Sequence, residues 1–281
     1  MTAARCEMPV AKAKQLANMA TCAALYTVAI AITAFVPTPW GVGQFRPGVV
    51  IPVIYAFLGG SLVAGVGAAV GTLLGSFILQ AAGTGLGPFG SLVSGVPANF
   101  IGFYLLGMFV SKYKSWKGFI FGSFVSLMIG NLVAAGGVAL YLTYVFPRWA
   151  SMVLEVKLGA ILGLTLFWTV TMLPFVLALV PIVIVALSRT GFSSMESFSY
   201  FRSASMKDVA VPSVSVAVIL GAIYALIVTT SVGTLMFASV VSEQNIFWVK
   251  SLFAFSSVIM IGFALVGVLL VSKSYHKSSS S

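Results

Sequence analysis

Apolar runs long enough to cross a lipid bilayer follow one another along almost the whole chain. A membrane-spanning helix needs roughly 20 predominantly apolar residues. Charged residues make up only 7% of this chain, and its mean hydropathy is +1.11. Soluble domains carry about 25% charged residues, and no polar stretch here is long enough for a separate soluble domain. The sequence therefore predicts an all-α polytopic membrane protein.

Breaks in the apolar pattern divide the chain into eight predicted spans. The second span is short, and a Gly59-Gly60 pair separates it from the third. Within the third span, glycines recur at every fourth position over 67–75, which we interpret as a face for close helix packing. The sixth contains Pro174 and Pro181, which predicts a kink or a tilt. The predicted spans are 14–36, 47–58, 60–80, 96–112, 117–144, 156–188, 212–241 and 246–272.

The distribution of basic residues gives an orientation. With a cytoplasmic N-terminus, the cytoplasmic segments hold 11 of the 15 Lys and Arg residues and the outer segments hold 4. Cytoplasmic loops carry an excess of Lys and Arg, so this bias predicts that both termini are cytoplasmic. The net charge of +10 has the same cause and gives no reason to expect nucleic acid as a partner. The four outer basic residues are Arg46, Arg148, Lys157 and Lys250.

The segment 190–211 separates a six-span unit from a two-span hairpin. It is rich in Ser and Phe with mixed charge, which indicates an irregular cytoplasmic linker. An in-plane helix with three phenylalanines (Phe192, Phe198 and Phe201) in the membrane interface is the alternative. The predicted domains are a six-span membrane domain over 1–189, the linker over 190–211, the hairpin over 212–273 and a disordered tail over 274–281.

Ionisable groups are almost absent from the predicted spans. None contains Asp, Glu or His at depth, and the only histidine, His276, lies in the C-terminal tail. Proton-driven transporters need buried ionisable relays, and metal-dependent membrane enzymes need clusters of His or carboxylate ligands. There is no Gly-rich phosphate loop, and Cys6 and Cys22 have no partners at metal-ligand spacing. We therefore expect neither an enzyme nor a self-contained ATPase, and no metal or cofactor.

Polar and aromatic residues gather instead in the predicted outer loops and the spans beside them. Aromatic faces with a few hydrogen-bonding groups and one carboxylate are the ingredients of a small-molecule site. An interfacial anchor is the favoured alternative for Trp149, and hydrogen bonding to neighbouring helices is the favoured alternative for Asn131. The predicted substrate-binding residues are Trp40, Gln44, Arg46, Asn99, Asn131, Trp149, Glu155 and Trp168.

The first predicted span carries small residues along one side. Spacings of four and three place these residues on one face of a helix, and such a stripe lets another helix approach closely in lipid. We expect Ala17, Ala20, Ala24 and Thr27 to dock a partner, with packing against the chain's own bundle as the alternative. The full stripe is Ala13, Ala17, Ala20, Ala24, Thr27, Ala31 and Ala34.

Several sequence segments occur together in a characteristic order. A basic N-terminus precedes ATCAALY in the first span, and the next outer loop ends in QFRPGVVIP. FLGGSLVAGVGAAVGTLLGSFI follows, and then a Gly-rich outer loop leads into ANFIGFYLLGMFV. In this order, residues 10–188 resemble the substrate-binding S component of energy-coupling factor (ECF) transporters, the vitamin importers of prokaryotes.

The resemblance implies a membrane subunit that binds a vitamin or related micronutrient from outside the cell. It implies no ATPase activity in this chain. Instead, an alanine motif of the first helix, here Ala20 and Ala24, would dock on a transmembrane coupling subunit that carries two ATPase subunits. The implied location is the plasma membrane of a prokaryote. The hairpin over 212–273 departs from the six-span unit of that family.

The residues themselves leave other functions open. An uncharged interior also fits a stand-alone channel or facilitator for a small neutral solute, and a membrane scaffold without a ligand is a third possibility. The substrate is equally open. Arg46 and Lys157 suit a carboxylate or phosphate, and tryptophans suit a flat heteroaromatic ring.

Overall fold

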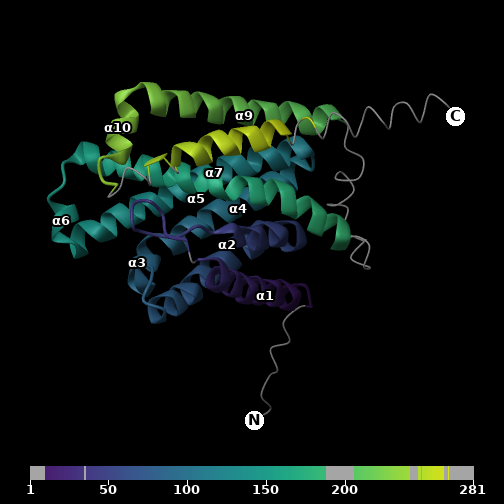
Figure 1. The fold of residues 1–281 in the computed structure, drawn as a ribbon. Coiled ribbons are helices and arrows are strands. Elements are labelled where there is room, and N and C mark those ends of the chain that lie inside the picture. Colours follow the sequence, from purple (N-terminus) through teal and green to yellow (C-terminus); the bar gives the residue numbers. More distant parts are fainter. Residues whose placement is uncertain are drawn as a thin grey trace, which may run out of the picture.

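The structure is a computed structural model, and within the described residues it is helical apart from turns and one isolated bridge, Pro37 to Gln44 (Figure 1). Five helices are long and apolar enough to cross a membrane, or six if the bent pair α3 and α4 is one span. The all-α membrane class is thus confirmed, while eight crossings and cytoplasmic termini stay predictions. The described residues are 10–34, 36–187, 206–240, 246–247, 249–262 and 265.

The long helices pack in chain order. Helix α1 packs against α2, α2 against α4, α4 against α5, and α5 against α7. The helices are α1 (Val10–Thr33), the 3-10 turn η1 (Pro47–Val49), α2 (Val50–Ala81), α3 (Gly87–Val93), α4 (Gly95–Tyr113), α5 (Trp116–Val145), α6 (Pro147–Ala150), α7 (Leu154–Leu187), α9 (Met206–Thr229), α10 (Ser231–Phe237) and an unlabelled helix over Val249–Gly262.

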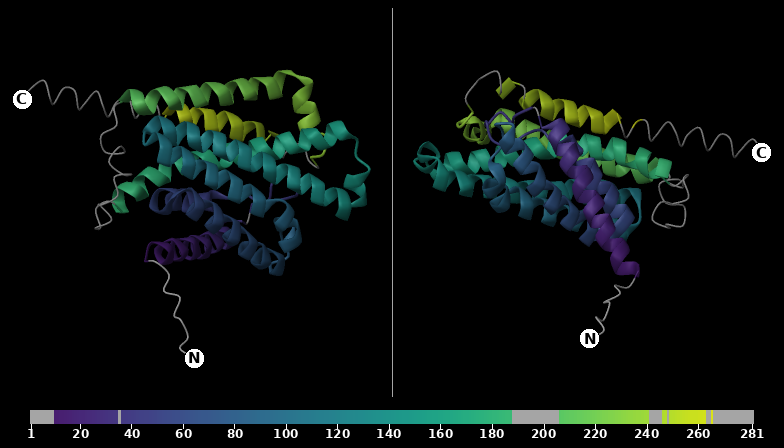
Figure 2. Two further views of the ribbon diagram at one scale, coloured as in Figure 1. Left: turned by 180° about the vertical axis from the view of Figure 1, so that it is seen from behind. Right: turned by 90° about the horizontal axis from the view of Figure 1, so that it is seen from below.

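The C-terminal helices cover the side of the bundle that lies opposite α1. Helix α9 packs on α5, and α10 packs on α7. The views in Figures 1 and 2 agree on this arrangement. They also place the loop over 36–46 together with α3, α6 and α10 at one end of the bundle. We call this end the loop end.

Helix α2 is a hairpin of two limbs, because the chain reverses at Gly60. This residue has φ 80° and ψ −172°, a conformation that essentially only glycine adopts. The contacts with α1 give the direction of each limb. They shift toward the N-terminus of α1 along the first limb and back toward its C-terminus along the second limb. Gly48 lies against Ala29, Tyr55 donates a hydrogen bond to Thr21, Gly67 lies against Cys22, and Gly75 lies against Ile30.

The break predicted at Gly59-Gly60 is therefore confirmed. The first limb, over 50–59, is only about 15 Å long at 1.5 Å per residue, roughly half the thickness of the hydrocarbon layer. The second limb, over 61–81, runs parallel to α1 with its glycine face against that helix. The glycines at 67, 71 and 75 thus serve close packing, as predicted, because a β-carbon at any of them would crowd α1.

Two predicted segments have different boundaries in the structure. The Gly-rich segment before α4 is partly helical, because Pro88 lies in the first turn of α3, where a missing N–H is tolerated. The predicted span 212–241 is broken at Thr230, whose extended backbone ends α9 and whose hydroxyl accepts a hydrogen bond from the Val232 N–H in α10.

The predicted linker is shorter than 190–211. Residues 206–211 already belong to α9, which continues through Pro212. Membrane helices tolerate proline because neighbouring groups satisfy the freed backbone atoms. The remainder of the predicted linker, the tail over 274–281 and most of 263–273 lie outside the described residues.

Candidate functional site

The loop over 36–46 folds back on itself at the loop end. Gly41 and Gly43 have φ values of 72° and 75°, in the left-handed region that favours glycine. The Thr38 N–H donates to the Gly43 carbonyl (3.1 Å). Arg46 then precedes a proline, which disfavours helical backbone at Arg46, and its φ is −132° and its ψ 67°. The two left-handed glycines, the backbone hydrogen bond and the proline together bring Gln44 and Arg46 to the bundle.

Two indole groups hold this loop from opposite sides. Trp168 of α7 donates its Nε1–H to the Gln44 carbonyl at 3.1 Å. Trp40 of the loop donates its Nε1–H to the Met236 carbonyl of α10, also at 3.1 Å. The Trp40 ring stacks on Phe237, with 6.2 Å between ring centroids. The loop is therefore fixed between α7 and α10.

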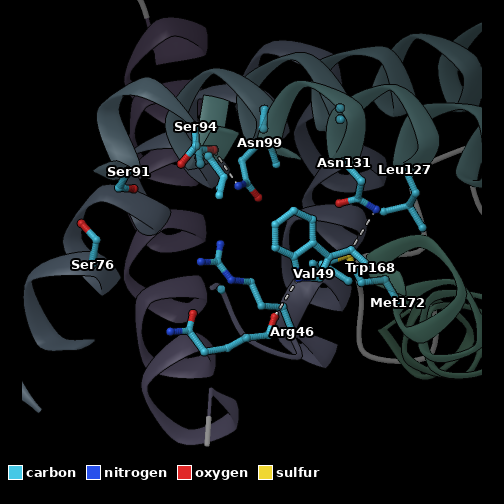
Figure 3. Close-up of a pocket in the computed structure, with 18 of the residues that line it drawn as sticks. Arg46, Val49, Ser76, Ser91, Ser94, Asn99, Leu127, Asn131, Trp168 and Met172 are labelled. Atoms are coloured by element: carbon cyan, nitrogen blue, oxygen red, sulfur yellow. Dashed lines mark hydrogen bonds between the residues drawn. The ribbon is translucent and has the colours of Figure 1, made fainter. Parts of the chain in front are cut away.

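A cavity lies beneath the loop, between α1, α2, α3, α4, α5 and α7. Its volume is about 80 Å³, compared with the roughly 10–15 Å³ that one water molecule needs on the same measure. The cavity therefore has room for more than isolated waters. Five predicted substrate-binding residues line it, and Figure 3 shows four of them with labels. The five are Gln44, Arg46, Asn99, Asn131 and Trp168.

Two asparagines bond to the cavity wall. The Tyr26 hydroxyl of α1 donates to Asn99 Oδ1 at 3.0 Å, and Asn99 Nδ2 donates to the Gly95 carbonyl at 2.7 Å. Asn131 Nδ2 donates to Thr169 Oγ1 at 3.1 Å. The interpretation of Asn131 as a residue bonded to a neighbouring helix thus holds, and the same residue also lines the cavity.

Three polar atoms of the lining lack a hydrogen-bond partner within the described part of the chain. They belong to Gln44, Ser91 and Ser126, which are 4%, 7% and 2% exposed. The other end of the Gln44 amide is bonded to Thr84 Oγ1 at 3.2 Å. Buried polar groups are normally paired, so these atoms mark where a bound molecule would make hydrogen bonds.

The remaining predicted substrate-binding residues lie outside the cavity lining. Trp40 packs against α10, as described above. Trp149 is buried and donates to the Ala139 carbonyl of α5 at 3.1 Å, so its ring ties α6 to the bundle. Glu155 is exposed in the first turn of α7. Lys157 donates to the Ala150 carbonyl rather than facing the cavity.

Several lining residues were not predicted. Ser91 and Ser126 were missed because single serines are common in membrane helices and carry no spacing signal. Tyr26 had a usable signal. It is the only aromatic residue between Val10 and Ala34, and it lies on the face of α1 that packs against α2, away from the exposed alanines.

The small-residue stripe of α1 faces away from the bundle along most of its length. Ala17, Ala20 and Ala24 are exposed, whereas Cys22 and Tyr26 on the other face are buried. Thr27 differs from the alanines, because its Oγ1 lies 3.1 Å from the Gly71 carbonyl of α2 and is half-buried. The stripe is thus open over Ala17, Ala20 and Ala24 and covered by the chain's own bundle from Thr27 to Ala34.

No group of three or more His, Cys, Asp and Glu side chains is placed to hold a metal ion in the described part of the chain. No protein-family model, curated protein or solved structure matches the chain. The resemblance to S components therefore stays a prediction, and the functional argument rests on the chain's own geometry.

Proposed function

We propose that this chain is the substrate-binding membrane subunit of an ATP-driven importer of the ECF type, for a vitamin or related micronutrient, in the plasma membrane of a prokaryote. The observation that carries the proposal is the cavity beneath the loop over 36–46. It is built from two loops, the turn η1 and six helices, and it combines unpaired polar atoms with an aromatic wall. Such a mixture is typical of small-molecule sites.

The described part of the bundle contains no Asp, Glu or His at depth, which supports an external energy source. The two acidic residues that the structure describes, Glu155 and Asp208, are exposed in the first turns of α7 and α9. Ion-coupled transporters usually carry such groups at depth in their membrane helices. Under the proposal, ATP hydrolysis by partner subunits provides the energy instead.

The open alanine face of α1 supports a protein partner. Lipid tails are as apolar as the helix surface, so helices associate in membranes mainly through close packing at small residues. Ala17, Ala20 and Ala24 would allow a helix of a transmembrane coupling subunit to approach the α1 backbone. The coupling subunit would in turn bind two ATPase subunits.

The test is gentle purification from the native membrane followed by native mass spectrometry. The expected result is a complex of this chain with a membrane subunit and two ATPase subunits, together with a bound mass of a few hundred daltons. Reconstitution of the purified complex in liposomes should then give solute uptake that requires ATP.

Two outcomes would contradict the proposal. Uptake by the isolated chain in liposomes without ATP would identify a stand-alone channel or facilitator. A chain that purifies without partners and without any bound small molecule would favour a scaffold.

A further inference from the structure

The cavity contains a positive charge without an acidic counterpart in the described residues. Arg46 lines the cavity and is half-buried. No lining residue is Asp or Glu, and both described acidic residues, Glu155 and Asp208, are exposed and outside the lining. A charge removed from water is costly unless it is paired, so this arrangement favours a ligand that carries a negative charge.

The surroundings of the Arg46 side chain are polar and neutral. In Figure 3 the guanidinium points into the space bordered by Ser76, Ser94 and Asn99. The Tyr26 hydroxyl is also close to it. These groups bond to protein atoms, since Ser76 donates to the Leu73 carbonyl and Ser94 to the Gly90 carbonyl, both at 2.6 Å. None of these groups carries a negative charge, so within the described residues the charge of the guanidinium is left for a ligand.

The wall beyond Arg46 sets the rest of the ligand's chemistry. Phe103, Leu106, Val138 and Trp168 give an apolar and aromatic surface. The unpaired atoms of Gln44, Ser91 and Ser126 lie in the same cavity and would bond to polar groups of the ligand. A ligand that satisfies both surfaces has an acidic group at one end and an apolar or flat body with a few polar atoms.

We propose that Arg46 binds the carboxylate or phosphate of a small amphiphilic anion in this cavity. The guanidinium of arginine matches both groups with two parallel hydrogen bonds. The inference rests on the proposed function only in using the same cavity, because an anion site would remain if the ATPase partners did not exist.

The test uses three probes that share a ring and differ in charge: benzoate, phenyl phosphate and the neutral benzamide. Dissociation constants would be measured with the detergent-solubilised full-length chain. The expected result is that one or both anions bind more tightly than benzamide. Arg46→Gln should weaken anion binding by about 10- to 100-fold, which corresponds to one charged hydrogen-bonding group, and leave benzamide binding unchanged.

Two variants control for damage to the fold. Arg46→Lys keeps the charge and should retain part of the preference for anions. Arg148→Gln removes an exposed arginine of α6 outside the cavity and should change nothing. The comparison of benzoate with phenyl phosphate distinguishes a carboxylate ligand from a phosphate ligand.

The proposal would be overturned by equal binding of benzamide and the anions, or by anion binding that survives Arg46→Gln. It would also be overturned if neither anion bound at 10 mM, because a dissociation constant above about this concentration is too weak to be useful. A ligand released from the native complex that is neutral or cationic at pH 7 would also overturn it. That last result would leave the proposed import function intact, whereas anion binding without ATP-dependent uptake would overturn the import function alone.

Discussion

The two sides of the bundle differ in whether other helices of the chain cover them. On the α1 side, the outermost helix presents exposed alanines, and no described helix covers them. On the opposite side, α10 packs against α7, and the aromatic ring of Trp40 fills the space between them. The α1 side has an open strip of residues with little side-chain bulk, while the other side is closed by large side chains.

This difference indicates which side of the chain is available to another protein. The C-terminal helices occupy one side, where they also hold the loop that borders the cavity. A partner helix would then approach α1, which contacts the cavity through Tyr26. The extra C-terminal hairpin is thus compatible with a partner on the opposite side.

The largest expected effect comes from adding bulk to the open side. Ala20→Trp should abolish ATP-dependent uptake and co-purification of the partner subunits, because an indole would prevent close approach to α1. Binding of a small molecule should remain, because Ala20 does not line the cavity. Uptake in proteoliposomes and pull-down of the complex measure both effects.

Leu25→Trp is the matched control for this substitution. Leu25 is 50% exposed on α1 and lies outside the alanine stripe, so the same added ring should leave uptake intact. If Ala20→Trp transported normally, the alanine face would have no role in docking.

A smaller effect is expected from a methyl group on the closed side. In Gly159→Ala the new β-carbon would collide with the Leu235 carbonyl of α10, so α10 must shift away from α7. Overpacking of this kind destabilises by about 1–3 kcal/mol. Thermal unfolding in detergent should show a lower midpoint than for Gly136→Ala, where a β-carbon meets nothing within 4 Å. Equal midpoints would mean that α10 is not packed tightly on α7.

Removal of a single indole N–H should loosen the loop without disturbing the aromatic packing. Trp40→Phe leaves the Met236 carbonyl unpaired, and one hydrogen bond of about 1 kcal/mol corresponds to about fivefold faster hydrogen exchange of the loop over 36–46. Trp149→Phe deletes a bond of the same length at another place, so it should leave exchange in this loop unchanged. The same exchange rate in both variants would show that α10 does not restrain the loop.

The smallest effect is expected at Thr27, where the stripe begins to face the chain's own bundle. Thr27→Val removes the hydroxyl near the Gly71 carbonyl and should lower the free energy of unfolding by about 0.6 kcal/mol, the typical value for such bonds in membranes. Uptake should not change. Loss of uptake at unchanged stability would place Thr27 in the partner interface after all.

Most of the fold could be predicted because it follows from local patterns. Apolar runs mark the helices, and a double glycine marks the reversal within α2. The break at Thr230 was missed because the apolar pattern continues across it, and only the capping hydroxyl marks the start of α10. The crossing count stays open for a physical reason, since the limb over 50–59 is shorter than the hydrocarbon layer is thick.

The candidate site could be predicted only in part, because the polarity of a residue does not tell which way its side chain points. Arg46 and Gln44 were found as polar residues beside a proline-glycine turn. Trp40, four positions earlier than Gln44, has the same aromatic character as Trp168 but bonds to a carbonyl 196 positions away in the chain. No local pattern carries such long-range pairing.

The reversal at Gly60 has a consequence for the way the chain enters the membrane. Ser61 is the single polar residue at the turn between the limbs of α2, and no charged residue lies there, so neither limb has a hydrated loop to hold it at the surface. A limb of about ten residues is also too short to be retained alone as a spanning helix. The two limbs should therefore partition into lipid together, as one helical pair, after α1 has been synthesised and can receive them.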